Sequence, residues 1–258
     1  MNNNKISINL KFLSSKWVFM TMIPILIATF IAFNGISQNT CNVHDLILSV
    51  FNNYFTIFYL LYLLFSIFVL KIIVKQGFNS YIYIRFKTRN QWFFSKIKFI
   101  GLIALVYVLA IIGICALESI GHFSFSNSWS EFGLNYFKGS PIILKSTPLT
   151  SVFISSLLLF FYLFTFGLII FVSSLFVKHN AFAFIIGFII NSINMMGFLM
   201  NSPLFYKIGF CHNTMLSLHK SGINSMKPSI SYSFIYWIIV ISILVLMGLK
   251  RINKIDFN

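Results

Sequence analysis

The sequence predicts an all-α membrane protein with six transmembrane helices, an N-terminal amphipathic surface helix and both termini on the cytoplasmic side. Of its 258 residues, 58% are hydrophobic and only 9% are charged, and the mean hydropathy is +0.88. Several apolar runs reach the roughly 20 residues that a helix needs to cross a bilayer, and the cations gather at the ends of these runs. Such a composition excludes an ordinary soluble domain.

The first 16 residues predict an amphipathic helix that lies on the inner membrane surface. Apolar residues recur there at i, i+4, i+7 and i+11, which is one stripe of a helix, and lysines are available to the lipid headgroups. The stripe is Ile6, Leu10, Leu13 and Trp17, and the lysines are Lys5, Lys11 and Lys16.

Six apolar runs follow and are the predicted transmembrane helices. Only Lys178, His179 and Asn180 separate the fourth run from the fifth, which predicts an antiparallel hairpin. Neither an internal repeat nor a loop long enough to form its own core is present, so residues 1–258 are expected to form one membrane domain. The runs cover about 17–34, 54–74, 99–117, 152–177, 181–200 and 232–249.

The distribution of cations predicts the orientation. Of the 19 Lys and Arg residues, 14 fall on one side of the predicted topology and five on the other. The positive-inside rule then places both termini in the cytoplasm and the loops near 35–53, 118–151 and 201–231 outside. A net charge of +15 in a soluble chain would suggest nucleic acid, but topology accounts for it here and no nucleic-acid partner is expected.

The sequence offers no catalytic residues. It lacks HExxH, GxSxG and GxxxxGK[ST], so neither an enzyme of these classes nor a nucleotide-binding P-loop is predicted. Asp45 and Asp256 fall in a predicted loop and tail, and Glu118 ends the third predicted span, where an interfacial role is expected. Because an ion-coupled carrier normally buries a charge in its spans, coupling to a gradient is disfavoured.

Cysteines and histidines give weak signals. Cys41, Cys115 and Cys211 have no CxxC spacing, and pairing of Cys41 with Cys211 stays open as a minor alternative. His212 and His219 beside Cys211 suggest an exposed polar loop rather than a metal site, because no carboxylate or second cysteine stands near them in the sequence.

Neutral polar residues stand within the fifth predicted span. Asn191, Ser192 and Asn194 lie between two glycines. Amides can bond across a helix pair and small residues allow close approach, so these residues indicate either interhelical packing or the lining of a substrate path.

The loop at 75–98 combines cations with aromatic residues. Thr88 and Gln91 fit the S/T-x-x-Q capping box, which predicts a helix that begins near Arg89 and runs through Trp92 into the third span. Exposed aromatic and Arg side chains are favoured interface anchors, so this loop is expected to dock on a soluble, energy-supplying partner. The expected contact residues are Arg85, Phe86, Lys87, Arg89 and Trp92.

This arrangement resembles the membrane subunits of ABC-2 type (type V) ABC exporters. The resemblance rests on the surface helix, the six spans, the basic loop after the second span and the longer outer segment at 201–231. RFKTRNQWFFSKI, from Arg85, is also similar to an R-x-K-[ST]-R-x-x-W-F pattern of small permeases from Gram-positive peptide-export and bacteriocin-immunity systems. The chain has no large outer domain, unlike the larger family members.

The resemblance implies a transport subunit of the bacterial cytoplasmic membrane. The basic loop would be a coupling helix on a separate ABC ATPase, which binds ATP and Mg²⁺, so this chain needs no cofactor or metal of its own. Residues 201–231 would dip back into the outer leaflet, with Pro203 breaking the helix and Phe205 in the re-entrant part. A second copy or a related permease would complete the transporter, which would move a peptide or, second, a lipid.

A different class of function stays open. The chain could be a membrane immunity or sensor protein that captures a peptide at its outer loops without pumping. Extraction of a toxin from the membrane stays open beside export.

Overall fold

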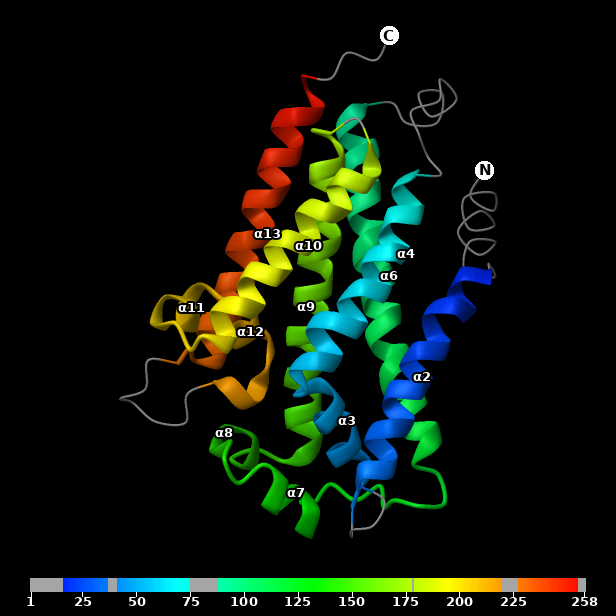
Figure 1. Ribbon diagram of the computed structural model, residues 1–258, viewed down its shortest axis with the longest axis vertical. Helices are drawn as coiled ribbons and strands as arrows, with labels where there is room; N and C mark the ends of the chain where they lie inside the picture. The colour runs from blue at the N-terminus through cyan, green and yellow to red at the C-terminus, as the bar shows by residue number, and fades with distance from the viewer. Residues whose placement is uncertain (1–15, 37–40, 75–87, 178, 220–226, 255–258) are drawn as a thin grey trace.

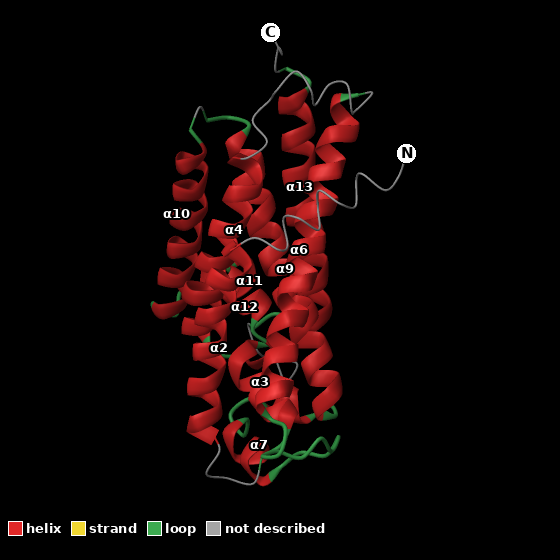
Figure 2. Ribbon diagram, turned by 90° about the vertical axis from the view of Figure 1, so that its right-hand side faces the viewer, coloured by secondary structure: helices red, strands yellow, loops and turns green. Residues whose placement is uncertain are grey.

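The computed structural model describes residues 16–36, 41–74, 88–177, 179–219 and 227–254. Within these ranges the chain is helical and contains no β-strand (Figures 1 and 2), so the all-α prediction is confirmed. Residues 1–15 of the predicted surface helix and residues 75–87 of the predicted coupling loop at 75–98 lie outside the described residues, whereas residues 89–98 form the first turns of α6. The elements in order are α2 (Lys16–Ile36), α3 (Val43–Phe51), the π-helix η1 (Thr56–Leu61), α4 (Tyr62–Val74), α6 (Arg89–Glu118), α7 (Glu131–Tyr136), α8 (Pro141–Leu144), α9 (Pro148–Ser174), α10 (Asn180–Leu199), α11 (Pro203–Ile208), α12 (Phe210–Thr214), the 3₁₀-helix η2 (Leu216–Leu218) and α13 (Ile230–Ile252).

A helix coincides with each of the six predicted spans, but they are not equivalent. Helices α6, α9, α10 and α13 are each long and apolar enough to cross a membrane. The second predicted span is part of a bent pair, in which α3 meets η1 and α4 at 67°, and it counts as a fifth crossing if the pair is one span.

The predicted outer loop at 35–53 is wrong for residues 43–51. These form α3, whose nine residues are all buried and which packs against α2, α6 and α9. The Asn42 side chain accepts from Asp45 N, while the Asp45 carboxylate accepts from Asn42 N. This reciprocal cap satisfies the first turn, so a short helix can be buried.

Asp45 is therefore a buried helix residue rather than a loop residue. Its carboxylate also accepts a hydrogen bond from Ser130, which caps α7. Asn42 donates through its side chain to Ser128 O at 2.7 Å. These bonds hold the 119–147 segment, with α7 and α8, as a cap over one end of the bundle (Figure 1).

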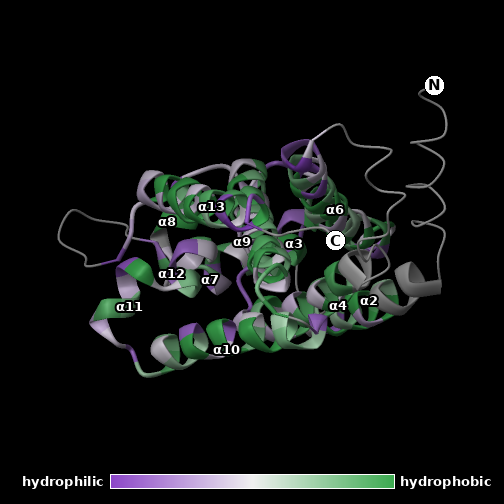
Figure 3. Ribbon diagram, turned by 90° about the horizontal axis from the view of Figure 1, so that it is seen from above, coloured by the Kyte–Doolittle hydropathy of each residue, from purple (hydrophilic) through white to green (hydrophobic). Residues whose placement is uncertain are grey.

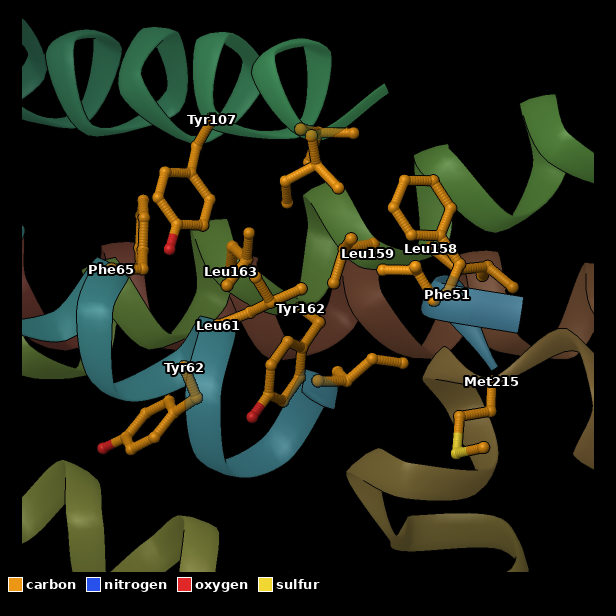
Figure 4. Packing of buried hydrophobic residues seen from close by; sticks show 14 of the residues in the cluster. Phe51, Leu61, Tyr62, Phe65, Tyr107, Leu158, Leu159, Tyr162, Leu163 and Met215 are labelled. Atoms are coloured by element: carbon orange, nitrogen blue, oxygen red, sulfur yellow. The ribbon is translucent and has the colours of Figure 1, made fainter. Parts of the chain in front are cut away.

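Helix α9 is the centre of the bundle. It packs against α3, α4, α6, α10 and α13, and the view along the long axis shows these helices around it (Figure 3). The turn between α9 and α10 forms the predicted antiparallel hairpin. A large buried cluster fills the space between α4, α6 and α9 (Figure 4).

The two ends of the bundle differ in charge. The start of α6, the end of α13 and the α9–α10 turn gather at the upper end of Figure 1, with Arg89, Lys96, Lys98, Lys250, Arg251 and Lys254. The described acidic residues Asp45, Glu118 and Glu131 belong to the opposite end.

Close packing of α9 on α6 predicts the effect of an added methyl group. A Cβ at Gly167 would lie 2.4 Å from Ile100 Cγ2, whereas one at Gly113 would meet nothing within 4 Å. We expect Gly167→Ala to destabilise the protein by about 1–3 kcal/mol. Gly113→Ala should be neutral or stabilising, because alanine favours helix. Thermal unfolding in detergent measures both, and equal midpoints would contradict the predicted clash.

Candidate partner-contact and re-entrant sites

The start of α6 is as the sequence predicts. Thr88 Oγ1 accepts a hydrogen bond from Gln91 N at 3.2 Å, and the helix begins at Arg89. The Arg89 guanidinium donates to Asn253 O over 3.5 Å, which connects the first turn of α6 to the end of α13. Arg85, Phe86 and Lys87 lie outside the described residues.

Trp92 is not the exposed anchor that the sequence predicts. Its side chain is only 7% exposed, and its ring lies 5.8 Å from that of Phe171 on α9. Phe93, Leu175 and Ile252 belong to the same buried cluster. Helix α6 continues without a break after Arg89, so Trp92 and Phe93, three and four residues later, lie on the face that packs into the bundle.

Two cations flank this aromatic cluster. Arg251 donates through Nε to Leu175 O at 3.0 Å, and its guanidinium lies 5.2 Å from the Phe176 ring. Lys96 is 8% exposed, with its ammonium 5.8 Å from the Trp92 ring. The sequence interpretation treats Lys96 as a loop cation. Its spacing of four from Trp92 and Ile100 would have placed it on the buried face.

The chain reverses after α10, and Pro203 starts the next helix rather than breaking one. The re-entrant placement that the resemblance implies stays a prediction. α10 ends at Leu199, Asn201 adopts a positive φ of 50°, and Pro203 begins α11. The Phe205 ring then packs over Gly197, where a Cβ would lie 2.4 Å from Phe205 Cδ1. Glycine at this position therefore allows α11 to fold back on α10.

The predicted exposed loop around His212 and His219 is wrong. All five residues of α12 are buried, and α12 packs against α9, α10 and α13. His212 lies between the rings of Phe198 and Tyr206, at 5.5 Å and 4.9 Å. Hydropathy misses this burial because a short segment with polar residues scores as a loop.

A hydrogen-bonded network fastens this segment to α13. The His219 ring nitrogens lie 2.9 Å from Met215 O and 2.8 Å from Ser233 Oγ. Ser233 Oγ also lies 2.8 Å from Asn213 Oδ1, so its single hydrogen serves one of the two partners at a time. Trp237 Nε1 donates to Asn213 O at 3.0 Å. The network therefore connects η2, α12 and α13.

The amides of α10 act in packing. Asn191 accepts from the Tyr162 hydroxyl at 2.8 Å and donates to Phe58 O at 2.7 Å, which joins α9, α10 and the π-helix η1. Asn194 Oδ1 accepts from Phe210 N at 2.9 Å, at the first residue of α12. Ser192 is half-buried. The packing interpretation thus accounts for both amides, and a place in a substrate path stays a prediction.

The thiols of Cys41 and Cys211 are free and buried. Cys41 donates to Ile36 O at 3.4 Å. Burial, with a smaller contribution from Asp45, raises the pKa of Cys41 to about 11, and burial raises that of Cys211 to about 12, so both are protonated at neutral pH. Among the described residues, no three His, Cys, Asp or Glu side chains lie close enough to hold a metal ion.

Burial of His219 predicts a stability that depends on pH. Burial lowers its pKa from 6.5 to about 4, and also lowers the pKa of His212. Between pH 6.5 and about 4, His219 binds a proton in the unfolded chain but not in the folded chain. The free energy of unfolding therefore falls as the pH decreases through this range.

We expect the unfolding midpoint in detergent to fall over this range, and to fall less in His219→Gln. His122→Gln removes an exposed imidazole and should follow the wild type. An equal fall in both variants would contradict the assignment to His219.

A further prediction concerns Asn191. Its replacement by Ala removes the bonds to the Tyr162 hydroxyl and to Phe58 O, and it leaves the buried Tyr162 hydroxyl unpaired, which costs about 1–3 kcal/mol. Thermal unfolding should therefore show a large loss for Asn191→Ala and little change for the neighbouring Ser192→Ala. Similar midpoints for the two variants would contradict a structural role for the amide.

Comparison with known proteins finds a distant similarity to an uncharacterized protein. The chain is 25% identical over 182 residues to an uncharacterized protein of Halalkalibacterium halodurans, which covers 70% of this chain and 67% of that protein. No family model matches the sequence, and no solved structure matches the fold.

Proposed function

We propose that this chain is the membrane-spanning permease subunit of an ATP-driven ABC exporter. In this proposal it has six spans, an amphipathic helix at 1–16 and both termini in the cytoplasm of a bacterial cell. It moves an amphipathic or hydrophobic substrate, a peptide first and a lipid second, out of the cell or membrane. A separate ATPase binds ATP and Mg²⁺, and a second permease completes the complex.

The chain reversal after α10 is the observation that carries the proposal. A re-entrant segment between the last two spans is part of the resemblance to ABC-2 exporters. The start of α11 at Pro203, the packing of Phe205 on Gly197 and the burial of α12 occur in that segment. They support a fixed element of the transmembrane domain rather than a free outer loop.

Packing at the cationic end supports a role in transmission. The first turns of α6 meet the ends of α9 and α13 in one cluster that contains Phe93, Phe171 and Ile252. A Cβ at Gly248 would lie 2.4 Å from Phe93, so α6 and α13 approach closely. A force on the loop before Thr88 would therefore reach three helices together, as a rigid-body shift requires.

The non-pumping alternative also has an observation in its favour. The cap formed by α7 and α8 is held to α3 through Asp45 and Ser130, so the outer end is an ordered surface that a peptide could contact. Reconstitution in liposomes separates the two functions. A permease moves peptide only with its ATPase and ATP, whereas a capture protein binds peptide equally without them.

Charge reversal tests the ATPase contact. We expect Arg85→Glu, Lys87→Glu and Arg89→Glu together to reduce co-purification with the cognate ATPase at least about tenfold, because each change replaces attraction by repulsion. The matched control reverses Lys138, Lys207 and Lys227, which are exposed and lie on the outer side of the membrane in the proposed topology. Unchanged association of the first variant, or equal loss in both, would remove the coupling role.

A further inference from the structure

Lys96 is a cation on the buried face of α6. It follows Arg89 by seven residues, so it lies about 10 Å farther along the helix axis. Lys98, two residues later, is exposed, whereas Lys96 is 8% exposed and belongs to the buried stripe that contains Trp92, Phe93 and Ile100. The two lysines thus have the same charge but opposite surroundings.

The described part of the chain supplies no counter-charge for Lys96. Its described acids, Asp45, Glu118 and Glu131, belong to the other end of the bundle. The ammonium lies over the Trp92 ring at 5.8 Å. A cation–π contact is worth about 0.5–2 kcal/mol, which is less than the several kcal/mol that withdrawing an ammonium from water costs. The position therefore calls for an anion.

Arg251 adds positive charge on the same aromatic cluster. Its Nε is occupied by Leu175 O, and its guanidinium covers Phe176. Among the described residues no bond engages its two terminal amino groups, which are left for a further acceptor. Ile252, the next residue, packs in one cluster with Trp92 and Phe93.

We propose that Lys96 binds the phosphate of an anionic phospholipid, with Arg251 adding to the attraction across the aromatic cluster. Basic pockets between transmembrane helices on the cytoplasmic side are suited to such headgroups. Phe176, just beyond α9, is an exposed apolar side chain beside the Arg251 guanidinium, and an acyl chain can lie against it. The assignment to the inner leaflet rests on the proposed orientation, whereas the binding itself does not.

The depth of Lys96 favours a lipid over a protein carboxylate. It lies one helical turn beyond Trp92, on the side away from the N-cap. A folded partner docks on exposed side chains, whereas a headgroup phosphate already lies at the membrane interface and is small enough to reach an almost buried ammonium.

The test compares wild type, Lys96→Gln, Lys96→Arg and Lys98→Gln. Each protein is purified in detergent, and bound phosphatidylglycerol is counted by mass spectrometry. The thermal unfolding midpoint is then measured with added phosphatidylglycerol, phosphatidylcholine or inorganic phosphate. Lys98→Gln makes the same charge change on the same helix, and Lys96→Arg keeps the cation.

We expect Lys96→Gln to retain about fivefold less phosphatidylglycerol, the factor for losing one cation near an anionic surface. Phosphatidylglycerol should raise the midpoint of the other three proteins and not that of Lys96→Gln, and phosphatidylcholine should raise none. Without lipid, Lys96→Gln should be as stable as wild type, because it removes an uncompensated charge. If it fails to fold, Arg251→Gln replaces it and should show a smaller loss of lipid.

Three results would overturn the proposal. Equal retention of phosphatidylglycerol in Lys96→Gln and wild type removes the site. If inorganic phosphate raises the unfolding midpoint of the wild type as much as phosphatidylglycerol does, the site binds the free anion rather than a lipid. Normal lipid retention with lost ATPase association assigns Lys96 to the protein contact. Because lipid binding is measured on this chain alone, failure of the exporter proposal leaves the expected result unchanged.

Discussion

The amide of Asn191 is the interaction on which the interior of the bundle depends. Apolar helices in lipid gain little from the hydrophobic effect when they associate, so close packing and a few polar bonds must set their arrangement. Asn191 accepts from Tyr162 on α9 and donates to Phe58 O in η1. A π-helix displaces backbone carbonyls from the regular pattern, and one of them here receives an amide hydrogen. Three helices are thereby fixed at one depth.

Side-chain amides also form hydrogen bonds between helices in the segment between α10 and α13. Asn194 Oδ1 accepts a hydrogen bond from Phe210 N at the start of α12. The Asn213 side-chain oxygen lies within hydrogen-bond distance of Ser233 Oγ, and the Asn213 backbone carbonyl accepts from Trp237 Nε1. A short helix that leaves the regular bundle exposes terminal backbone groups, which hydrocarbon cannot satisfy. Neighbouring amides and hydroxyls provide the partners, so the reversal after Pro203 can lie against the bundle rather than in water.

The sequence predicts where helices occur better than it predicts which faces are inside. The start of α6 at Arg89 follows from the Thr88 cap, and the α9–α10 hairpin follows from the short polar break between two apolar runs. The burial of Trp92 and of all five residues of α12 could not be predicted from the sequence in this way. Hydropathy separates lipid from water, but lipid and protein interior are both apolar, so a membrane helix carries little contrast between its faces. The sequence did contain a local indication of α3, because Asn42 and Asp45 stand three residues apart, as the first and last residues of a capping box do.

Helix α6 connects the two ends whose charges differ. It runs unbroken from its cap at Thr88 to Glu118, and Glu118 accepts from Thr29 of α2 at 2.9 Å. An uninterrupted helix packed on α9 along its length resists bending, because each interdigitated side chain would have to move. In the proposed complex, a displacement of its cationic end by the ATPase would be carried to the contact with α2 as a shift of the whole helix. In that geometry the polar bond between Thr29 and Glu118, rather than a contact near the middle of the bundle, is where α2 would register the movement.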